Sequence, residues 1–232
     1  MESKLELDTW LGSVLEKAVY KYTYNSDNLI SIKWPKEKCM IYTKIDVNNS
    51  NVLNKLLREG FRLIDVNIQM KANIEKASIK SNSSIEIAQD CDELQIKEIA
   101  GKEFKYDRFH ADPLIENAIA KKIKEKWVAT YFKGKRGYKL YISRLENKAV
   151  GFVLIMRHKN SIVVDLLAVS NKYRGRGVGK NLLLKCLEEG AKLENDFIYV
   201  GSQLRNIPAI NLYEKTGFRY AKSSFVLHKH NF

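Results

Sequence analysis

The sequence lacks several features that would place it in a class directly. Its 232 residues contain no apolar run long enough to cross a bilayer, and the first eight lack the basic-then-apolar form of a signal peptide. The three cysteines are scattered, with no C-x-x-C pair and no histidine at ligand spacing, which predicts reduced thiols rather than disulfides or a zinc site. The sequence therefore predicts a soluble, cytoplasmic protein that needs no metal.

Two common phosphate-binding patterns are also missing around the most glycine-rich stretch. Gly175, Gly177 and Gly179 do not have the spacing G-x-G-x-x-G, and no G-K-[ST] follows them. The stretch does lie between a β-branched apolar run at 162–169 and an amphipathic helical pattern that starts near residue 180. A strand, a glycine-rich turn and a helix N-terminus form an anion cradle, because free backbone N–H groups and the helix dipole face the ligand. A pyrophosphate is the expected ligand, and an ordinary strand-to-helix turn is the alternative.

Positive charge is abundant and unevenly distributed. The net charge is +13, with 13 Lys/Arg against 10 Asp/Glu in residues 1–83 and 27 against 17 in residues 84–232. A basic second part suits an anionic ligand such as CoA or a sugar nucleotide, and it also suits nucleic acid; solvated lysines are the alternative. On a helix expected at 113–131, Lys121, Lys122, Lys124 and Lys126 are assigned to the exposed side and expected to be solvated.

The order of elements predicts two parts. In the first, residues 5–24 are ambiguous between helix and strand, 29–34 alternate, and a strand at 38–47, a helix at 52–58 and a strand at 61–70 follow. The weakly patterned stretch 71–83 is the expected junction. In the second part, the pattern predicts a strand at 84–88, a helix to residue 100, a charged loop at 106–113 and the helix at 113–131. A hairpin at 138–157, the strand at 162–169 and a helix are expected next. The remaining expected elements are a strand at 197–201, a helix at 207–215 and closing strands at 218–228. The corners at 60–61 and 217–218 are both Gly-Phe, which suggests a degenerate repeat, although a helix C-cap glycine explains each one locally.

Two motifs in this order resemble the GCN5-related N-acetyltransferase (GNAT) superfamily. The first is R-x-x-G-x-G behind a strand that ends in Leu-x-Val, and the second is N-x-x-A-x-x-L-Y-x-x-x-G-F from Asn206 to Phe218. The resemblance implies an α/β fold with a mixed central sheet flanked by helices in residues 84–232. It also implies that residues 1–83 form a partial, degenerate GNAT-like half-domain.

The resemblance further implies acetyl-CoA as the cosubstrate and assigns residues to it. Tyr213 is implied as the general acid for the leaving thiolate, because a phenol is protonated at neutral pH. Two carboxylates, Asp65 and Asp165, stay open as the general base that relays the amine proton through water. The implied acetyl-CoA contacts are Leu167, Ala168, Val169, Arg174, Gly175, Arg176, Gly177, Val178, Gly179, Lys180 and Asn206.

A narrower resemblance concerns the acceptor. Tyr106-Asp-Arg-Phe-His-Ala-Asp-Pro113 and Gly60-Phe-Arg-Leu-Ile-Asp65 are similar to the dTDP-fucosamine acetyltransferase group, which acetylates the amine of a dTDP-linked 4-amino-4,6-dideoxy sugar. This implies a small-molecule sugar nucleotide as partner, with acceptor contacts from Arg108, His110 and Asp112. A membrane partner is not expected, nucleic acid is disfavoured, and a homodimer is compatible with the sequence. The alternatives are a protein or peptide N-acetyltransferase and a non-catalytic CoA-sensing or nucleic-acid-binding module.

Overall fold

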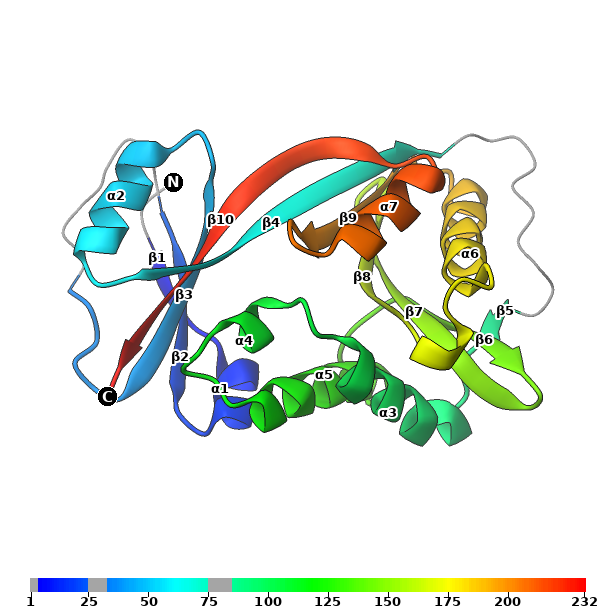
Figure 1. Ribbon diagram of the computed structural model, residues 1–232, viewed down its shortest axis with the longest axis horizontal. Coiled ribbons are helices and arrows are strands. Elements are labelled where there is room, and N and C mark those ends of the chain that lie inside the picture. Colours follow the sequence, from blue (N-terminus) through cyan, green and yellow to red (C-terminus); the bar gives the residue numbers. More distant parts are fainter. Residues whose placement is uncertain (1–3, 25–32, 75–84) are drawn as a thin grey trace.

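A single mixed sheet of ten strands forms the centre of the computed structural model, which describes residues 4–24, 33–74 and 85–232 (Figure 1). The strands follow one another across the sheet in the order β1-β2-β3-β10-β4-β9-β8-β7-β6-β5. Their bounds are β1 Lys4–Leu7, β2 Ala18–Thr23, β3 Cys39–Asp46, β4 Arg62–Asn73, β5 Ile85–Ile87, β6 Lys139–Leu145, β7 Lys148–His158, β8 Ser161–Val169, β9 Phe197–Gln203 and β10 Arg219–Asn231. The helices are α1 Thr9–Leu15, α2 Ser50–Arg58, α3 Glu93–Glu103, α4 Arg108–Ala111, α5 Asn117–Phe132, α6 Val178–Lys192 and α7 Ile207–Lys215, with short 3-10 turns at Asp90–Asp92 and Asn171–Tyr173. None of the described helices is both long and apolar enough to span a membrane.

Two long strands join the two parts of the molecule. Strand β4 pairs antiparallel with β9 on one side and β10 on the other, and β10 in turn pairs antiparallel with β3. In Figure 1 these two strands arch from the N-terminal part on the left to the C-terminal part on the right. The predicted division at residue 83 remains a prediction, and the strand order shows that the two parts share one sheet.

The two Gly-Phe corners have the same local structure. Gly60 (φ 87°) follows α2 and Gly217 (φ 90°) follows α7, and each adopts the left-handed conformation that glycine allows at a helix end. Phe61 and Phe218 are buried directly after the corner, with 3% and 0% of their surface exposed. The strands that start there, β4 and β10, pair with each other.

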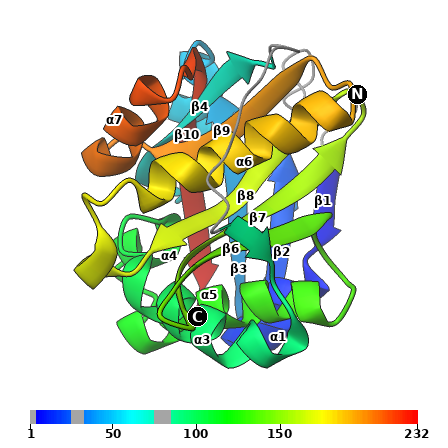
Figure 2. The same ribbon diagram turned by 90° about the vertical axis from the view of Figure 1, so that its right-hand side faces the viewer.

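Helices cover both faces of the C-terminal strands (Figure 2). Successive side chains of a strand point to opposite faces, so one strand can serve two cores. Tyr141, Val153 and Ile155 belong to the core that includes α6, whereas Leu140 and Phe152 belong to the core formed with α3 and α5. These strands are apolar on both sides for this reason, as the apolar run at 162–169, broken only by Asp165, predicts.

The N-terminal strands pack partly on helices of the C-terminal part. Leu11 of α1 and Met40 of β3 share a buried cluster with Phe109 of α4 and Ile123 of α5. On the other face of these strands, α2 packs over a separate cluster that contains Ile41, Val52, Leu56 and Leu227. The first cluster fixes the N-terminal strands against α4 and α5.

Several sequence-based boundaries need correction. The ambiguous stretch 5–24 contains β1, α1 and β2, and most of the alternating stretch 29–34 lies outside the described residues. The loop expected at 106–113 contains the short helix α4, because Asp107 accepts hydrogen bonds from the backbone N–H groups of Phe109 and His110. The following helix begins at Asn117 rather than at Pro113, and the side chain of Asp112 caps the turn in between by accepting from Leu114 N. The closing strands are one strand, β10.

We expect the shared sheet to make the two parts unfold together. Ile41→Ala, at a position with no exposed surface in β3, should lower the free energy of unfolding by about 2–5 kcal/mol. Leu63→Ala in β4, where 47% of the side chain is exposed, is the matched control and should cost about 0.5 kcal/mol or less. Urea unfolding followed by far-UV circular dichroism and by tryptophan fluorescence should give coincident transitions. Two separated transitions in the Ile41 variant would contradict this expectation.

Candidate functional site

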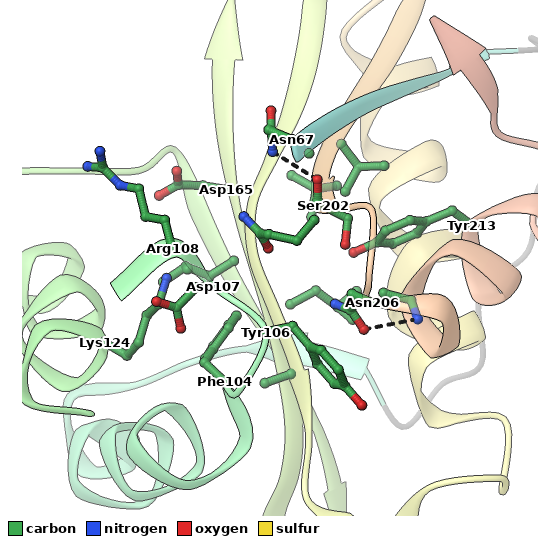
Figure 3. Close-up of a pocket in the computed structure, with 18 of the residues that line it drawn as sticks. Asn67, Phe104, Tyr106, Asp107, Arg108, Lys124, Asp165, Ser202, Asn206 and Tyr213 are labelled. Atoms are coloured by element: carbon green, nitrogen blue, oxygen red, sulfur yellow. Dashed lines mark hydrogen bonds between the residues drawn. The ribbon is translucent and has the colours of Figure 1, made fainter. Parts of the chain in front are cut away.

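The candidate site is a cavity of about 1100 Å³ where β8 and β9 diverge (Figure 3). These strands pair in parallel from Ser161–Phe197 to Val164–Val200, and no further pairs join them. Residues 165–169 of β8 and 201–203 of β9 line the cavity beyond that point. The β8 edge that faces the cavity therefore presents backbone groups that no neighbouring strand has taken.

The glycine-rich loop forms one wall of this cavity. Gly175 (φ 76°) and Gly177 (φ 79°) adopt the left-handed conformation, and a Cβ added at either would meet no atom within 4 Å. Glycine is thus required there for backbone conformation rather than for space. Gly177 is the N-cap of α6, and Gly179 and Lys180 in the first turn of that helix also line the cavity. The predicted strand, turn and helix are confirmed as elements.

Most residues predicted to contact acetyl-CoA line the cavity. Leu167 to Val169, Arg174, Gly175, Val178 and Asn206 do so in addition to the residues above. The exception is Arg176, which is not part of the lining and whose guanidinium carbon lies 5.5 Å from the centre of the Tyr173 ring.

A carboxylate that the sequence interpretation did not single out holds Arg174. Arg174 Nη2 lies 2.5 Å from Glu103 Oε2, and its Nε donates to the backbone oxygen of Val169 at 3.1 Å. The other oxygen of Glu103 accepts from the backbone N–H of Asn171 at 2.9 Å. Glu103 at the end of α3 therefore fixes both the start of the glycine-rich loop and its arginine at the end of β8.

Tyr213 and Asn206 both belong to α7. Asn206 is the N-cap of this helix, where its Oδ1 accepts from Ala209 N at 3.4 Å. Tyr213 is 5% exposed and lines the cavity, and in Figure 3 its hydroxyl points from α7 into that space. Burial, with a smaller contribution from Cys186, raises the pKa of Tyr213. A protonated phenol at neutral pH is the state that a proton donor needs.

The two carboxylates proposed as general base lie in different surroundings. Asp165 lines the cavity, and its carboxylate accepts from Trp127 Nε1 at 2.9 Å and from Arg136 Nε and Nη2 at 2.8 Å each. The register between β7 and β8 shifts by one residue at this position, which is the geometry of a β-bulge. The bulge and the bidentate arginine together fix where this carboxylate points.

Asp65 does not line the cavity. Its Oδ2 accepts from Arg205 Nε at 3.0 Å and its Oδ1 from Val66 N at 2.8 Å, while burial raises its pKa. Arg205 also donates to the backbone oxygens of Tyr106 and Asp107 at 3.3 Å. This pair ties β4 to the segment before α4, and the role of Asp65 as base stays a prediction.

Of the three residues predicted to contact the acceptor, Arg108 alone lines the cavity. His110 lies outside the lining, where its Nδ1 lies 2.7 Å from Asp107 Oδ2. Asp112 is 2% exposed and lies in a buried network instead. The chain order Arg108-Phe-His-Ala-Asp112 suggested one loop surface, but α4 turns these side chains in different directions.

That network links Asp112 to two histidines and two cations. Asp112 Oδ2 lies 2.6 Å from His228 Nδ1 and 2.8 Å from His230 Nε2. The other ring nitrogens face cations, with Arg108 Nη1 at 3.5 Å from His228 Nε2 and Lys17 Nζ at 3.2 Å from His230 Nδ1. Cations only donate, so these distal nitrogens accept, and the nitrogens that face Asp112 carry the protons. The pattern assigns two neutral histidines that both donate to one carboxylate.

The same three side chains could be considered a metal site. Ligand atoms of Asp112, His228 and His230 lie within 4.8 Å of one another. A histidine that binds a metal needs an unprotonated nitrogen towards the ion, with its N–H on the far side. Here the far sides face Arg108 and Lys17, which require acceptors. The donor set therefore fits a hydrogen-bond network and does not fit a metal centre.

The cavity is strongly cationic. Eight Lys/Arg side chains and three carboxylates line it. The cations are Lys21, Lys44, Lys105, Arg108, Lys124, Arg174, Lys180 and Lys215, and the carboxylates are Glu103, Asp107 and Asp165. Glu103 and Asp165 are bound to arginines and Asp107 to His110, so the excess of positive charge is available to a ligand.

The prediction that Lys124 is solvated is wrong. Only 6% of it is exposed, whereas Lys121, Lys122 and Lys126 are exposed as expected. Its ammonium lies 4.9 Å, 5.6 Å and 4.8 Å from the ring centres of Phe104, Phe109 and Trp127, respectively. The helical pattern was misleading because α5 is covered by α4 as well as α3, so the side chain at this position is enclosed. The nearby aromatic residues were the available sequence signal.

Lys44 is a second residue that the sequence interpretation missed. It lies in β3 and projects into the cavity, where its Nζ donates to Asn67 Oδ1 at 3.2 Å. Burial against the surrounding protein lowers the pKa of Lys44 to about 8. Repulsion from the nearby cations adds to this effect; they are Arg108, Lys21, Lys222 and Lys124. The signal for it was a lysine inside a largely apolar strand.

Comparison with known proteins identifies the family. The family model described as "Acetyltransferase (GNAT) family" matches residues 97–218, just over half of the chain. This chain belongs to the GNAT acetyltransferase family, whose cosubstrate is acetyl-CoA. The fold expected from the sequence is confirmed.

Curated relatives match over shorter regions. The spore coat polysaccharide biosynthesis protein SpsD of Bacillus subtilis is 25% identical over 133 residues, which cover 57% of this chain and 46% of that protein. The N-acetylaspartate synthetase of Homo sapiens is 28% identical over 99 residues, which cover 42% of this chain and 33% of that protein. The chain thus spans less than half the length of these two relatives.

Solved structures agree on the fold. A GCN5-related N-acetyltransferase from Sphaerobacter thermophilus has a TM-score of 0.63 and 12% identity, covering 92% of this chain and 73% of that chain. A tandem GNAT protein from the clavulanic acid biosynthesis pathway has a TM-score of 0.60 and 10% identity, covering 92% and 75%. Both alignments extend over more of the chain than the family model does, so the N-terminal part also has counterparts in these folds.

The buried network predicts a marked loss of stability in acid. Burial is the main cause that lowers the pKa of His228 from 6.5 to about 4, so below pH 6.5 the unfolded chain binds a proton that the folded chain does not. The free energy of unfolding should fall by about 3 kcal/mol between pH 6.5 and 4. Although burial opposes it, hydrogen bonds from His228 and His230 lower the pKa of Asp112, whose protonation continues the loss below pH 4.

Urea denaturation at a series of pH values tests this. His228→Asn removes the titrating group and should flatten the profile between pH 6.5 and 4, at a lower overall stability. His158→Asn, at an exposed position, is the control and should keep the profile of the unmodified protein. An unchanged slope in the His228 variant would show that other groups cause the acid loss.

Proposed function

We propose that this protein is an acetyl-CoA-dependent N-acetyltransferase whose acceptor is the amine of a nucleotide-linked 4-amino-4,6-dideoxy sugar, with dTDP as the expected nucleotide. The observation that carries the proposal is the extent of the cavity, which continues from the glycine-rich loop to cations of β2, β3, α4 and α5. Acetyl-CoA accounts for the loop side, and the cationic far side suits an acceptor that carries its own negative charge. The family and the named acetyltransferase relatives support the reaction type.

The proposed mechanism is direct attack of the amine on the thioester. The backbone N–H groups from Gly175 to Lys180 would hold the pyrophosphate of acetyl-CoA, and the free edge of β8 at 167–169 would bind the pantetheine amides. The neutral amine adds to the thioester carbonyl, whose oxygen takes negative charge and is stabilised by a backbone N–H of the same edge. Collapse of this intermediate breaks the C–S bond, and Tyr213 protonates the thiolate that leaves.

The proton that the amine loses needs an acceptor within reach of the cavity. Asp165 lines the cavity, so we propose it as the first candidate, with Asp65 acting only through intervening water. The hydrogen bonds from Arg136 and Trp127 would hold the carboxylate of Asp165 in one orientation.

A second acceptor class is supported by the comparisons. Relatives named as N-acetylaspartate synthetase match this chain, at 32% identity over 95 residues for the Xenopus tropicalis protein. An amino acid with additional carboxylates would also suit a cationic cavity. A relative from Sulfolobus acidocaldarius is named as N-alpha-acetyltransferase. Peptides are therefore also assayed as acceptors.

The acceptor can be identified by thiol release from acetyl-CoA. The purified protein would be assayed with dTDP-4-amino-4,6-dideoxy sugars, the corresponding UDP sugars, L-aspartate and peptides with free N-termini. We expect turnover with a dTDP sugar at a kcat/KM well above the other acceptors. Turnover only with aspartate or only with peptides would reject the sugar assignment while leaving the acetyl-CoA site in place.

Tyr213→Phe tests the proton donor. We expect kcat to fall by about 10²- to 10⁴-fold, because the thiolate then leaves without a positioned acid, while the Kd for acetyl-CoA stays unchanged. Tyr220→Phe, at a position with 61% exposure in β10, is the matched control and should keep full activity. Equal kcat in the Tyr213 variant and the unmodified protein would reject this role.

A further inference from the structure

Three cations on the far side of the cavity carry no carboxylate partner. We call Lys44, Arg108 and Lys124 the cationic cluster. Among the described residues, no carboxylate oxygen lies within 4.0 Å of any of their charged nitrogens. This differs from the other cavity-lining arginine, Arg174, which has a carboxylate in contact.

The carboxylates of the neighbourhood are committed to other donors. Asp8 accepts from the hydroxyl of Tyr42 at 2.8 Å and from Leu11 N at 2.9 Å. Asp107 is bound to His110 and to the backbone N–H of Phe109. Both act on the cluster only from a distance, so part of its charge remains uncompensated.

The members of the cluster lie close enough to repel one another. Arg108 and Lys124 both contribute to the lowered pKa of Lys44, and Arg108 contributes to that of Lys124, in each case after burial. Holding like charges close together is unfavourable unless an opposite charge joins them. An anion bound among the three would remove this cost.

Aromatic rings hold two of the cations in place without neutralising them. The guanidinium of Arg108 lies 4.0 Å from the Tyr42 ring centre and 4.6 Å from that of Phe109. Lys124 is enclosed by the three rings described above, is 94% buried and still reaches the cavity. No hydrogen bond or ion pair of its ammonium is present within the described part of the chain. Ring faces stabilise a cation and leave its N–H donors available.

Two members of the cluster lie across the cavity from Tyr213 and Asn206. In Figure 3, Arg108 and Lys124 lie on the side of α5 and Asp165, whereas Tyr213 and Asn206 lie on the side of α7. Lys44 comes from β3 in the N-terminal part, and the other two come from α4 and α5. An acceptor could therefore place its amine near Tyr213 and its anionic group on the cluster.

We propose that Lys44, Arg108 and Lys124 form an anion subsite that binds a phosphoryl group of the acceptor and so selects acceptors that carry one. This inference rests on the proposed function and assigns the N-terminal part of the chain a direct role in acceptor binding. Three cations that converge from different elements suit the several oxygens of a diphosphate. The contact of Arg108 with His228 keeps the guanidinium in place before the acceptor arrives.

Binding of an anion without turnover tests the subsite separately from the reaction. The protein would first be saturated with CoA, which occupies the glycine-rich loop and prevents a phosphate probe from binding there. Thymidine diphosphate, inorganic pyrophosphate and malonate would then be titrated by calorimetry. We expect thymidine diphosphate and pyrophosphate to bind, with a Kd that rises steeply with salt.

Lys124→Met should weaken this binding about 10- to 100-fold, because it removes one charge-assisted contact and keeps most of the packing volume. The Kd for CoA should not change. Lys126→Met, two residues along the same helix on its exposed side, is the matched control and should bind all probes normally. Removal of a buried, unpaired charge should leave the melting temperature of the anion-free protein equal or higher, while the increase on adding thymidine diphosphate is lost. If Lys124 were only structural, the variant would have a lower melting temperature and would still be stabilised by thymidine diphosphate.

Lys44→Met supplies a second variant at an exposed position where folding is not at risk. Normal binding of every probe to both variants would overturn the proposal, and so would the absence of any binding to the unmodified protein. Binding of malonate without the phosphate probes would overturn the phosphoryl assignment and favour a dicarboxylate acceptor. Probe binding through the cluster, together with failure of every dTDP sugar in the turnover assay, would retain the subsite and reject the particular sugar.

Discussion

The divergence of β8 and β9 is the constraint on which the rest of the site depends. Each strand remains paired on its outer side, β8 with β7 as far as Val169 and β9 with β4 as far as Gln203. Pairing between them stops at Val164 and Val200, so the gap opens between two strands that are otherwise fixed. Because both outer ladders continue, the free backbone edge is held rigidly, and a ligand can bind it without first ordering a loop.

Strand β4 gives the N-terminal part a structural role in that divergence. It belongs to the first seventy-three residues, yet it is the strand that holds β9 away from β8. The side chain of Asn67 in β4 reinforces this by donating to the backbone oxygen of Ser202 in β9 at 2.9 Å, and its Oδ1 accepts from Lys44. The same strand thus supports the wall of the cavity at β9 and orients Lys44 on the far side of it. Loss of the N-terminal part would alter both.

The sequence was informative where chemistry is local and uninformative where it depends on distant pairing. The loop from Arg174 to Gly179 and the helix with Asn206 and Tyr213 could be located because glycine conformation and helix capping act within a few residues. The insertion of β4 between β9 and β10 could not be predicted, since register is set by strands more than 100 residues apart.

Side-chain partners across long separations were lost for the same reason. Asp165 was recognised as a candidate base, but its partner Arg136 lies 29 residues earlier and has no pattern that marks it. Asp112 was expected in the acceptor site because it belongs, with Arg108, to the loop that resembles the dTDP-fucosamine acetyltransferase group. Its partners His228 and His230 are more than 100 residues away on β10, and they place it in the interior. Lys124 was misassigned because helical spacing identifies which residues share a face and does not identify what covers that face.

The electrostatics of the interior follow one division of roles. Buried charged groups that hold the fold each have a hydrogen-bond partner, as in the two histidines that donate to Asp112 and in the bidentate pair of Arg136 and Asp165. Lys44, Arg108 and Lys124, which face the cavity, have no carboxylate in contact, and burial, with a further contribution from their mutual repulsion, lowers the pKa of Lys44 and of Lys124. The unfavourable repulsion between Lys44, Arg108 and Lys124 therefore lies at a place where a bound anion can reduce it. Binding of the acceptor would then be driven by relief of a repulsion that folding imposed, and an uncharged amine of the same shape would gain none of that free energy.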